Sequence, residues 1–145
     1  MYTTKDKTRM AVSVIMVLAM AFTMLVASAS SAFATSSYAF HFRVNPRQAN
    51  GHEVTPRYRG DVSPSNQWWV KLIKSGEGKG AFTDFWLEAK DGVNLSPYRR
   101  VQCGSGWYGQ GAYASASGRK VFLTAEDNNY KMSGYNVSGR WQPQD

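Results

Sequence analysis

The sequence predicts an all-β fold: a single antiparallel β-sandwich or small barrel of about seven strands, preceded by a cleaved signal peptide. Apolar and polar residues alternate with a period of two in several segments, which is the pattern of half-buried strands. No window shows a convincing helical period. Residues 35–145 also hold 17 aromatic residues and all 13 glycines, a composition that favours short strands and tight turns.

The N-terminal third reads as a secretory signal peptide. Lys5, Lys7 and Arg9 precede an apolar run over residues 10–27, and residues 32–34 (AFA) form a small-residue cleavage signature. The alternative is an uncleaved membrane anchor, because a run of this length could just span a bilayer. The small-residue exit and the lack of a positive flank after the run favour cleavage after Ala34. We therefore expect a signal peptide at 1–34 and one secreted β domain at 35–145.

Charge and cysteine content narrow the setting. The whole chain has a formal net charge of +7, and the expected secreted part keeps 14 basic and nine acidic residues, a net charge of +5. Cys103 is the single cysteine, so no intramolecular disulfide can form. A lipoprotein is excluded, because no cysteine lies near the cleavage region. A secreted protein without a disulfide is more typical of a Gram-positive bacterium than of a eukaryotic secretory pathway.

The first predicted strand covers residues 38–44, where Tyr, Phe, Phe and Val share one face. Residues 45–66 contain three prolines and form a long polar connection, with a short edge strand around 54–59. The next strand, 67–74 (QWWVKLIK), carries one indole of Trp68-Trp69 on each face. At least one of these two indoles is therefore a candidate for exposure.

The remaining strands follow at short spacing. A glycine-rich segment at 75–80 predicts a flexible hairpin connection to a strand at 81–89. A Lys-Asp-Gly turn precedes the strand at 98–103, which ends at a Gly-Ser-Gly turn. The last three expected strands are 107–115, 119–125 and 135–141, with a tight Asp-Asn-Asn turn between the final two.

Nucleotide and metal motifs are absent or incomplete in the sequence. Residues 76–80 (GEGKG) lack the spacing, the hydroxyl residue and the following helix of a phosphate-binding loop. Residues 126–129 (EDNN) lack the spaced pattern of a calcium loop, and a turn that satisfies its own backbone is expected there. Cys103 alternates with Val101 and is expected to be a buried thiol. The alternative is that it acts together with His41 or His52 as a nucleophile or a metal ligand. We expect no cofactor and no metal.

Hydrolase chemistry also finds little support. Asp84 and Glu88 share a strand face, but four strand residues separate their Cα atoms by about 13 Å. Paired glycosidase carboxylates lie ~5–9.5 Å apart, so these acids are expected to be solvated or salt-bridged, although either could pair with an acid on another strand. No G-x-S-x-G elbow is present. No catalytic residue is predicted, and the protein is expected not to be an enzyme.

The strongest unexplained feature is a mixture of aromatic and basic residues. Trp69, Lys71 and Lys74 lie on one predicted strand, and Arg99 and Arg100 lie on another. An exposed Trp beside cations can stack on a sugar ring or lie at a lipid headgroup. The alternative is that the indoles cover the sheet faces and the cations only solubilise the protein. These five residues are the candidate ligand-binding residues, and their exposure decides between the two interpretations.

The C-terminal two thirds resembles a family of small secreted proteins of Gram-positive, Bacillus-type bacteria, catalogued only as a domain of unknown function. The most specific stretches are 125–130 (AEDNNY) and 135–141 (YNVSGRW). They are similar to the AENNNY and Y-x-V-S-G-Y-W segments of that family, and this chain departs from them at Asp127 and Arg140. The resemblance covers roughly residues 38–141 and implies a signal peptide and a compact secreted β domain, with no catalytic residue to carry over.

We therefore expect a secreted, extracellular, non-enzymatic protein that binds at the Gram-positive cell envelope. Walls that carry teichoic acid are anionic, and a basic domain would be retained there electrostatically. The alternative is a bacteriocin-like secreted antagonist or toxin, which a small, basic, Trp- and Gly-rich chain also fits. Nucleic acid is set aside because of the expected compartment, and no membrane-spanning segment is expected after processing. The sequence leaves the ligand, the strand order and the oligomeric state open.

Overall fold

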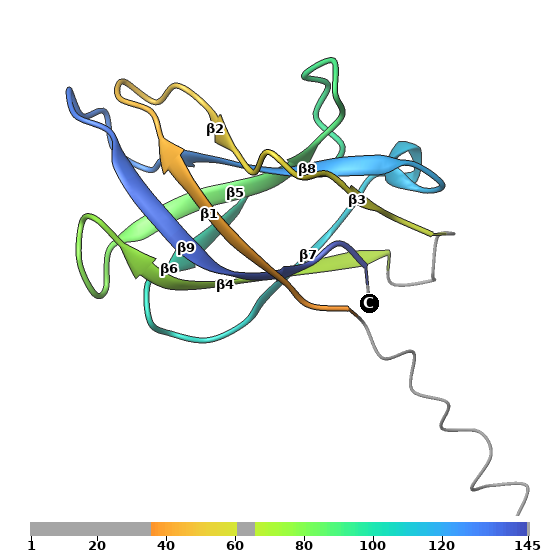
Figure 1. The fold of residues 1–145 in the computed structure, drawn as a ribbon, viewed down its shortest axis with the longest axis horizontal. Helices are drawn as coiled ribbons and strands as arrows, with labels where there is room; N and C mark the ends of the chain where they lie inside the picture. The colour runs from red at the N-terminus through yellow and green to blue at the C-terminus, as the bar shows by residue number, and fades with distance from the viewer. Residues whose placement is uncertain (1–35, 61–65, 145) are drawn as a thin grey trace, which may run out of the picture. The chain divides into compact units, whose positions relative to one another are not determined.

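Two antiparallel sheets face each other in the computed structural model, which describes residues 36–60 and 66–144 (Figure 1). The strands are β1 (Tyr38–Val44), β2 (Gly51–His52), β3 (Arg57–Tyr58), β4 (Gln67–Ser75), β5 (Phe82–Glu88), β6 (Arg99–Gln102), β7 (Tyr108–Gly111), β8 (Lys120–Asp127) and β9 (Tyr135–Gln142). Sheet A has the order β1-β9-β4-β7, and sheet B has the order β2-β8-β5-β6, with β3 also paired to β8. The predicted all-β sandwich is confirmed.

One core lies between the sheets, and alternation along the strands fills it. In β4 the side chains of Trp68, Val70 and Leu72 are fully buried, whereas the positions between them face outward. The other large side chains that are fully buried come from both sheets and from the β5–β6 connection: Val44, Phe85, Leu87, Leu95, Val101, Val121, Leu123, Val137 and Trp141. Residues 35–145 form one compact unit that holds all nine strands described.

The connection at 75–80 differs from its prediction. It was expected to join two strands of a hairpin, but β4 belongs to sheet A and β5 to sheet B. The segment therefore crosses from one sheet to the other. Gly78 and Gly80 have φ of +99° and +85°, a left-handed conformation that glycine adopts without steric cost. Hairpin and crossing connections need the same glycines, so local sequence could not distinguish them.

Three segment boundaries also changed. The strand predicted at 107–115 is wrong for its second half, because β7 ends at Gly111 and a short 3-10 helix, η1, covers Ala114–Ala116. The strand predicted at 119–125 extends to Asp127, whose Oδ1 accepts a hydrogen bond of 2.9 Å from the backbone N–H of Asn129. The polar connection contributes two short strands, β2 and β3, that both pair with β8.

Gly139 marks the tightest approach inside sheet A. It pairs with Phe40 on β1 and with Leu72 on β4. A Cβ atom at this position would overlap the backbone carbonyl oxygen of Lys71 and lie 2.9 Å from ring carbons of Phe40. The register shifts one step further along β4, where Ile73 forms a bulge between Leu72 and Lys74.

A buried hydrogen bond links the two sheets. The hydroxyl oxygens of Thr83 on β5 and Tyr135 on β9 lie 3.0 Å apart. Burial of the ring raises the pKa of Tyr135 to about 12, with smaller contributions from the nearby carboxylates of Asp127 and Asp84. Tyr135 is therefore neutral throughout the physiological range.

The predicted signal peptide at 1–34 lies outside the described residues. Within the part of the chain that the structure describes, no helix is long and apolar enough to cross a membrane.

Candidate functional site

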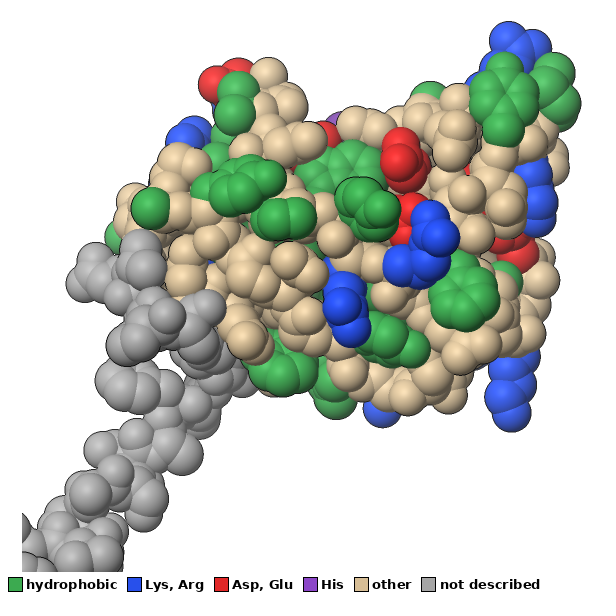
Figure 2. Space-filling view, turned by 180° about the vertical axis from the view of Figure 1, so that it is seen from behind, with side chains coloured by type: hydrophobic (Ala, Val, Ile, Leu, Met, Phe, Trp, Pro, Cys, Tyr) green, Lys and Arg blue, Asp and Glu red, His purple; other side chains and the backbone are tan. Residues whose placement is uncertain are grey.

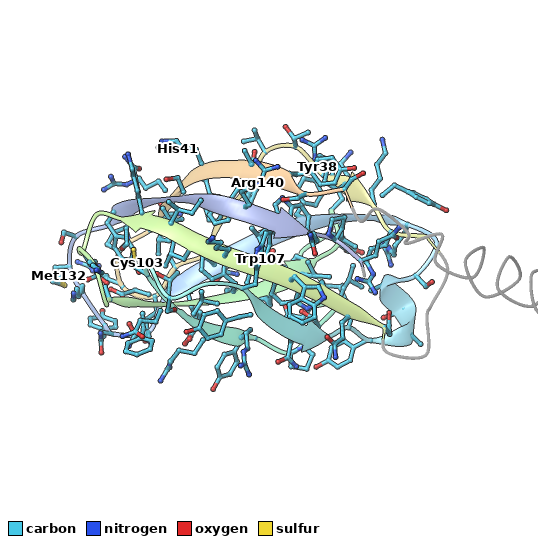
Figure 3. All side chains as sticks on the ribbon, turned by 90° about the horizontal axis from the view of Figure 1, so that it is seen from below. Tyr38, His41, Cys103, Trp107, Met132 and Arg140 are labelled. Atoms are coloured by element: carbon cyan, nitrogen blue, oxygen red, sulfur yellow. The ribbon has the colours of Figure 1, made fainter. Side chains whose placement is uncertain are left out.

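The outward side of sheet A carries a group of cations that the strand order brings together. Lys71 on β4 pairs directly with Arg140 on β9, and Lys74 on β4 pairs with Ser138 in the next outward row. Arg43 lies on the outward side of β1, opposite Asn136 of β9. Figure 3 shows Arg140 on the same side of the sandwich as His41 of β1. We refer to Arg43, Lys71, Lys74 and Arg140 as the basic face.

Trp69 adjoins the basic face, two residues before Lys71 on the same side of β4. Its partner on the neighbouring strand β7 is Gly109. A Cβ atom added to Gly109 would lie 3.0 Å from the Cη2 and Cζ3 atoms of the Trp69 indole. The indole of Trp69 thus lies across the bare backbone of Gly109. Trp68 points the other way and is fully buried, while Trp69 remains partly exposed. The prediction of one indole on each side of the strand is confirmed.

Acidic side chains are lacking on this side of the described strands. The outward positions of sheet A hold no Asp or Glu in β1, β4, β7 or β9. The two ion pairs found among the described residues, Arg100–Asp84 and Lys131–Glu77, both lie elsewhere. A carboxylate lies beside the β1 edge, where Glu53 accepts a hydrogen bond of 3.1 Å from the backbone N–H of His41.

Arg140 is held in position by the chain that leads into β1. Its Nε and Nη2 atoms each donate a hydrogen bond of 2.8 Å to Ser37, to the hydroxyl oxygen and the backbone carbonyl oxygen respectively. Neither bond neutralises the guanidinium charge, so Arg140 contributes a full and oriented positive charge. Sequence reasoning missed Arg140 and Arg43 as candidates, although both alternate with buried residues of their strands.

The structure does not bring Arg99 and Arg100 to the basic face. Both lie on β6, at the edge of sheet B. Arg100 donates two hydrogen bonds, of 2.9 and 2.8 Å, to the two carboxylate oxygens of Asp84. The hydrogen bond and the charge of Asp84 raise the pKa of Arg100 above its ordinary value. Arg99 lies over the ring of Tyr108, with its guanidinium carbon 5.4 Å from the ring centroid.

The acids of sheet B gather on its outward side. Asp84 pairs across the sheet with Glu126 of β8. Burial, and secondarily the charge of Asp84, raises the pKa of Glu126 above its ordinary value. Glu88 lies four residues after Asp84 on the same side of β5. It accepts hydrogen bonds from Trp86, Asn50 and Thr124. The expectation of a solvated or salt-bridged acid is confirmed for Asp84 and is wrong for Glu88, which is buried and held by three neutral donors. The acid that another strand places beside Asp84 is Glu126.

The remaining candidate groups have structural surroundings. Cys103 is buried, and its Sγ lies 3.5 Å from the backbone carbonyl oxygen of Ile73. The expected buried thiol is confirmed. In 36–60 and 66–144, no group of three or more His, Cys, Asp or Glu side chains is arranged to hold a metal ion.

Comparison with known proteins identifies one family. The family model described as Protein of unknown function (DUF2712) matches residues 27–145. No curated protein and no solved structure matches the chain. The resemblance to a domain of unknown function is confirmed, while the Gram-positive origin and the two-segment signature stay predictions.

Proposed function

We propose that this chain, which belongs to the DUF2712 family, is a secreted, non-enzymatic protein that binds an anionic polymer of the Gram-positive cell envelope through its basic face. The observation that carries the proposal is the clustering of Arg43, Lys71, Lys74 and Arg140 on one side of sheet A, with no acid at the outward strand positions described. Teichoic acid is a polymer of the required charge.

Electrostatics supports a polymer rather than a single small anion. The four cations come from three strands, β1, β9 and β4, and they are spread over the sheet instead of converging on a point. Like charges placed this close repel one another unless a polyanion neutralises them. Salt screens the attraction between exposed charges, and at about 0.1–0.15 M it largely removes the attraction at separations beyond about 8–10 Å. The proposed binding is therefore strongly dependent on ionic strength.

The non-enzymatic part of the proposal draws support from the acids. Arg100 occupies both carboxylate oxygens of Asp84, and Glu88 is engaged by three donors. A carboxylate in this state is poorly suited to act as a base or a nucleophile. The secreted location rests on the N-terminal pattern of basic, apolar and small residues described above.

Co-sedimentation with purified sacculi tests the proposal. The secreted form, residues 35–145, is mixed with sacculi that keep or lack teichoic acid, over a series of salt concentrations. We expect retention to require teichoic acid. The logarithm of the binding constant should fall linearly with the logarithm of the salt concentration. By analogy with other polyphosphates, Lys71→Gln with Arg140→Gln should lower the slope by about 1.5.

A matched double variant controls for net charge. Lys90→Gln with Lys120→Gln removes two exposed cations outside the basic face and should leave the slope nearly unchanged. Equal loss in the two double variants would show that only the overall charge matters. No retention at low salt would contradict the proposal, and growth inhibition of related strains would then support the antagonist alternative.

A further inference from the structure

A hollow of about 460 Å³ opens on the outward side of sheet B, on the opposite face of the sandwich from the basic face. This volume lies within the ~300–1,000 Å³ of typical small-molecule sites. Its wall consists of side chains from β5, β8 and three connections: Trp86, Glu126, Asn50, Asn94, Tyr98 and Tyr113. In Figure 1, β1 and β9 pass in front of β5, so Figure 2 views sheet B from outside and shows apolar rings, carboxyl groups and cations side by side.

The floor of the hollow is fixed by a buried carboxylate. The indole N–H of Trp86 donates a 2.8 Å hydrogen bond to Oε1 of Glu88, and the side-chain amide of Asn50 donates one of 3.1 Å to the same oxygen. The hydroxyl of Thr124 donates to Oε2 at 3.1 Å. Hydrogen bonds to a charged acceptor are stronger than neutral ones. Trp86 and Asn50 are therefore held in place before any ligand arrives.

The rim is equally well anchored. Asn94 forms a β-bridge with Glu88, and the backbone N–H of Leu95 donates a 2.7 Å hydrogen bond to the carbonyl oxygen of Leu87. The backbone N–H of Tyr113 in turn donates a 2.8 Å hydrogen bond to the carbonyl oxygen of Leu95. These bonds tie the segments that carry Asn94 and Tyr113 to β5 and to each other. The hollow is thus a built feature and not a gap between mobile loops.

Polar groups that the protein leaves unused line this hollow. Among the described residues, the side chains of Glu126, Asn94, Tyr98 and Tyr113 make no hydrogen bond within the protein. Tyr98 and Tyr113 are 62% and 48% exposed, so their ring faces are accessible. Two accessible rings and several unused donors and acceptors converge on one space.

We infer that this hollow binds a neutral oligosaccharide of hexopyranose rings. Pyranoses present apolar C–H faces that pack on aromatic rings, and hydroxyl groups that bond to carboxylates and amides; Tyr98 with Tyr113, and Glu126 with Asn94, offer these two kinds of partner. A polyanion does not fit, because Glu126 would repel it. Asp84, which pairs with Glu126 across the sheet, already engages Arg100 in a salt bridge. The two faces of the molecule are thus assigned to different ligands by their charges.

Titration of the secreted form, residues 35–145, with oligosaccharides tests the inference by proton–nitrogen correlation spectra. Chitotetraose and cellotetraose are the two probes, and they distinguish N-acetylated from plain hexopyranoses. We expect shifts of the Trp86 indole N–H and of the Asn50 and Asn94 side-chain amides. The indole signal of Trp69 on sheet A should not move.

Three variants locate the binding. Tyr98→Ala and Tyr113→Ala should each weaken binding about five- to tenfold, whereas Tyr130→Ala removes an exposed ring outside the hollow and should not change it. The spectra themselves show whether each variant is folded. Three results would each overturn the inference. They are spectra that neither probe changes at about 10 mM, shifts centred on Trp69, and unchanged affinity in both hollow variants. Lys71→Gln with Arg140→Gln should bind the oligosaccharide normally, so the two proposals can fail separately.

Discussion

Gly139→Ala is expected to destabilise the sandwich by roughly 2–3 kcal/mol. The added Cβ would overlap the carbonyl oxygen of Lys71 and lie 2.9 Å from the ring of Phe40, so β4 and β1 must both move. Overpacking of this kind costs about 1–3 kcal/mol, and one weakened ladder hydrogen bond adds about 0.5–1.5 kcal/mol. The lower entropy of the unfolded alanine chain offsets about 0.4–1 kcal/mol.

Chemical denaturation followed by tryptophan fluorescence measures this cost, because Trp68 and Trp141 are fully buried in the core that would loosen. A thermal scan should show a Tm lower by roughly 10 °C or more for a domain of this size. Gly111→Ala is the matched control: it also lies in a strand of sheet A, but its Cβ would meet no atom within 4 Å. Gly111→Ala should therefore be neutral or slightly stabilising. Equal stability of the two variants would refute the packing described for Gly139.

Three further outcomes follow from the core and from the raised pKa values of Glu126 and Tyr135. Leu123→Ala should cost about 2–5 kcal/mol in denaturation, because Leu123 is fully buried, whereas Val54→Ala, at a 79% exposed side chain, should stay within about 0.5 kcal/mol. The raised pKa of Glu126 means that its contribution to stability is complete below the unfolded value of about 4.3 and is lost as pH rises through the folded value. Glu126→Gln should therefore be more stable than the native chain at pH ~7, and the difference should close under acid in pH-dependent melts; a constant difference would contradict the burial of this carboxyl. Tyr135 has a pKa of about 12 against about 10 when unfolded, so stability should fall between these values as pH rises. Ultraviolet titration of tyrosinate follows Tyr135 directly, and Tyr135→Phe should remove this part of the alkaline loss.

The strands themselves were predictable because their alternation is local. Residues 38–44 have the predicted period and form β1 with the predicted buried side. An antiparallel sheet with one buried and one solvent-exposed side requires only that apolar and polar residues alternate along each strand. This alternation can be seen in the sequence of a single strand. The same reasoning failed after Gly111, where alternation of large and small residues continued but the chain turned into η1. In this segment the buried residue is Ala116, which η1 and not a strand carries into the core.

The basic face could not be predicted as a group because it depends on strand order. Lys71 and Arg140 are 69 residues apart and meet only because β4 pairs with β9. Arg100 was chosen from sequence for its charge, but its strand places it opposite Asp84. Charge and local face are readable in a sequence, whereas the partner across the sheet is a property of topology. Candidate binding residues on different strands therefore needed the fold before they could be grouped.

The two outward sides of the sandwich differ in their chemistry, and solubility alone does not require this difference. Mixed charges would solubilise a small domain better than segregated ones. Sheet A instead presents cations that are not paired with acids, while sheet B presents Glu126 and the salt-bridged Asp84 beside accessible tyrosines. The core lies between the two sides, so ligands on them do not compete for space. A wall that carries both a polyanion and glycan chains would engage both sides at once, and linked weak contacts of this kind bind more tightly together than either does alone.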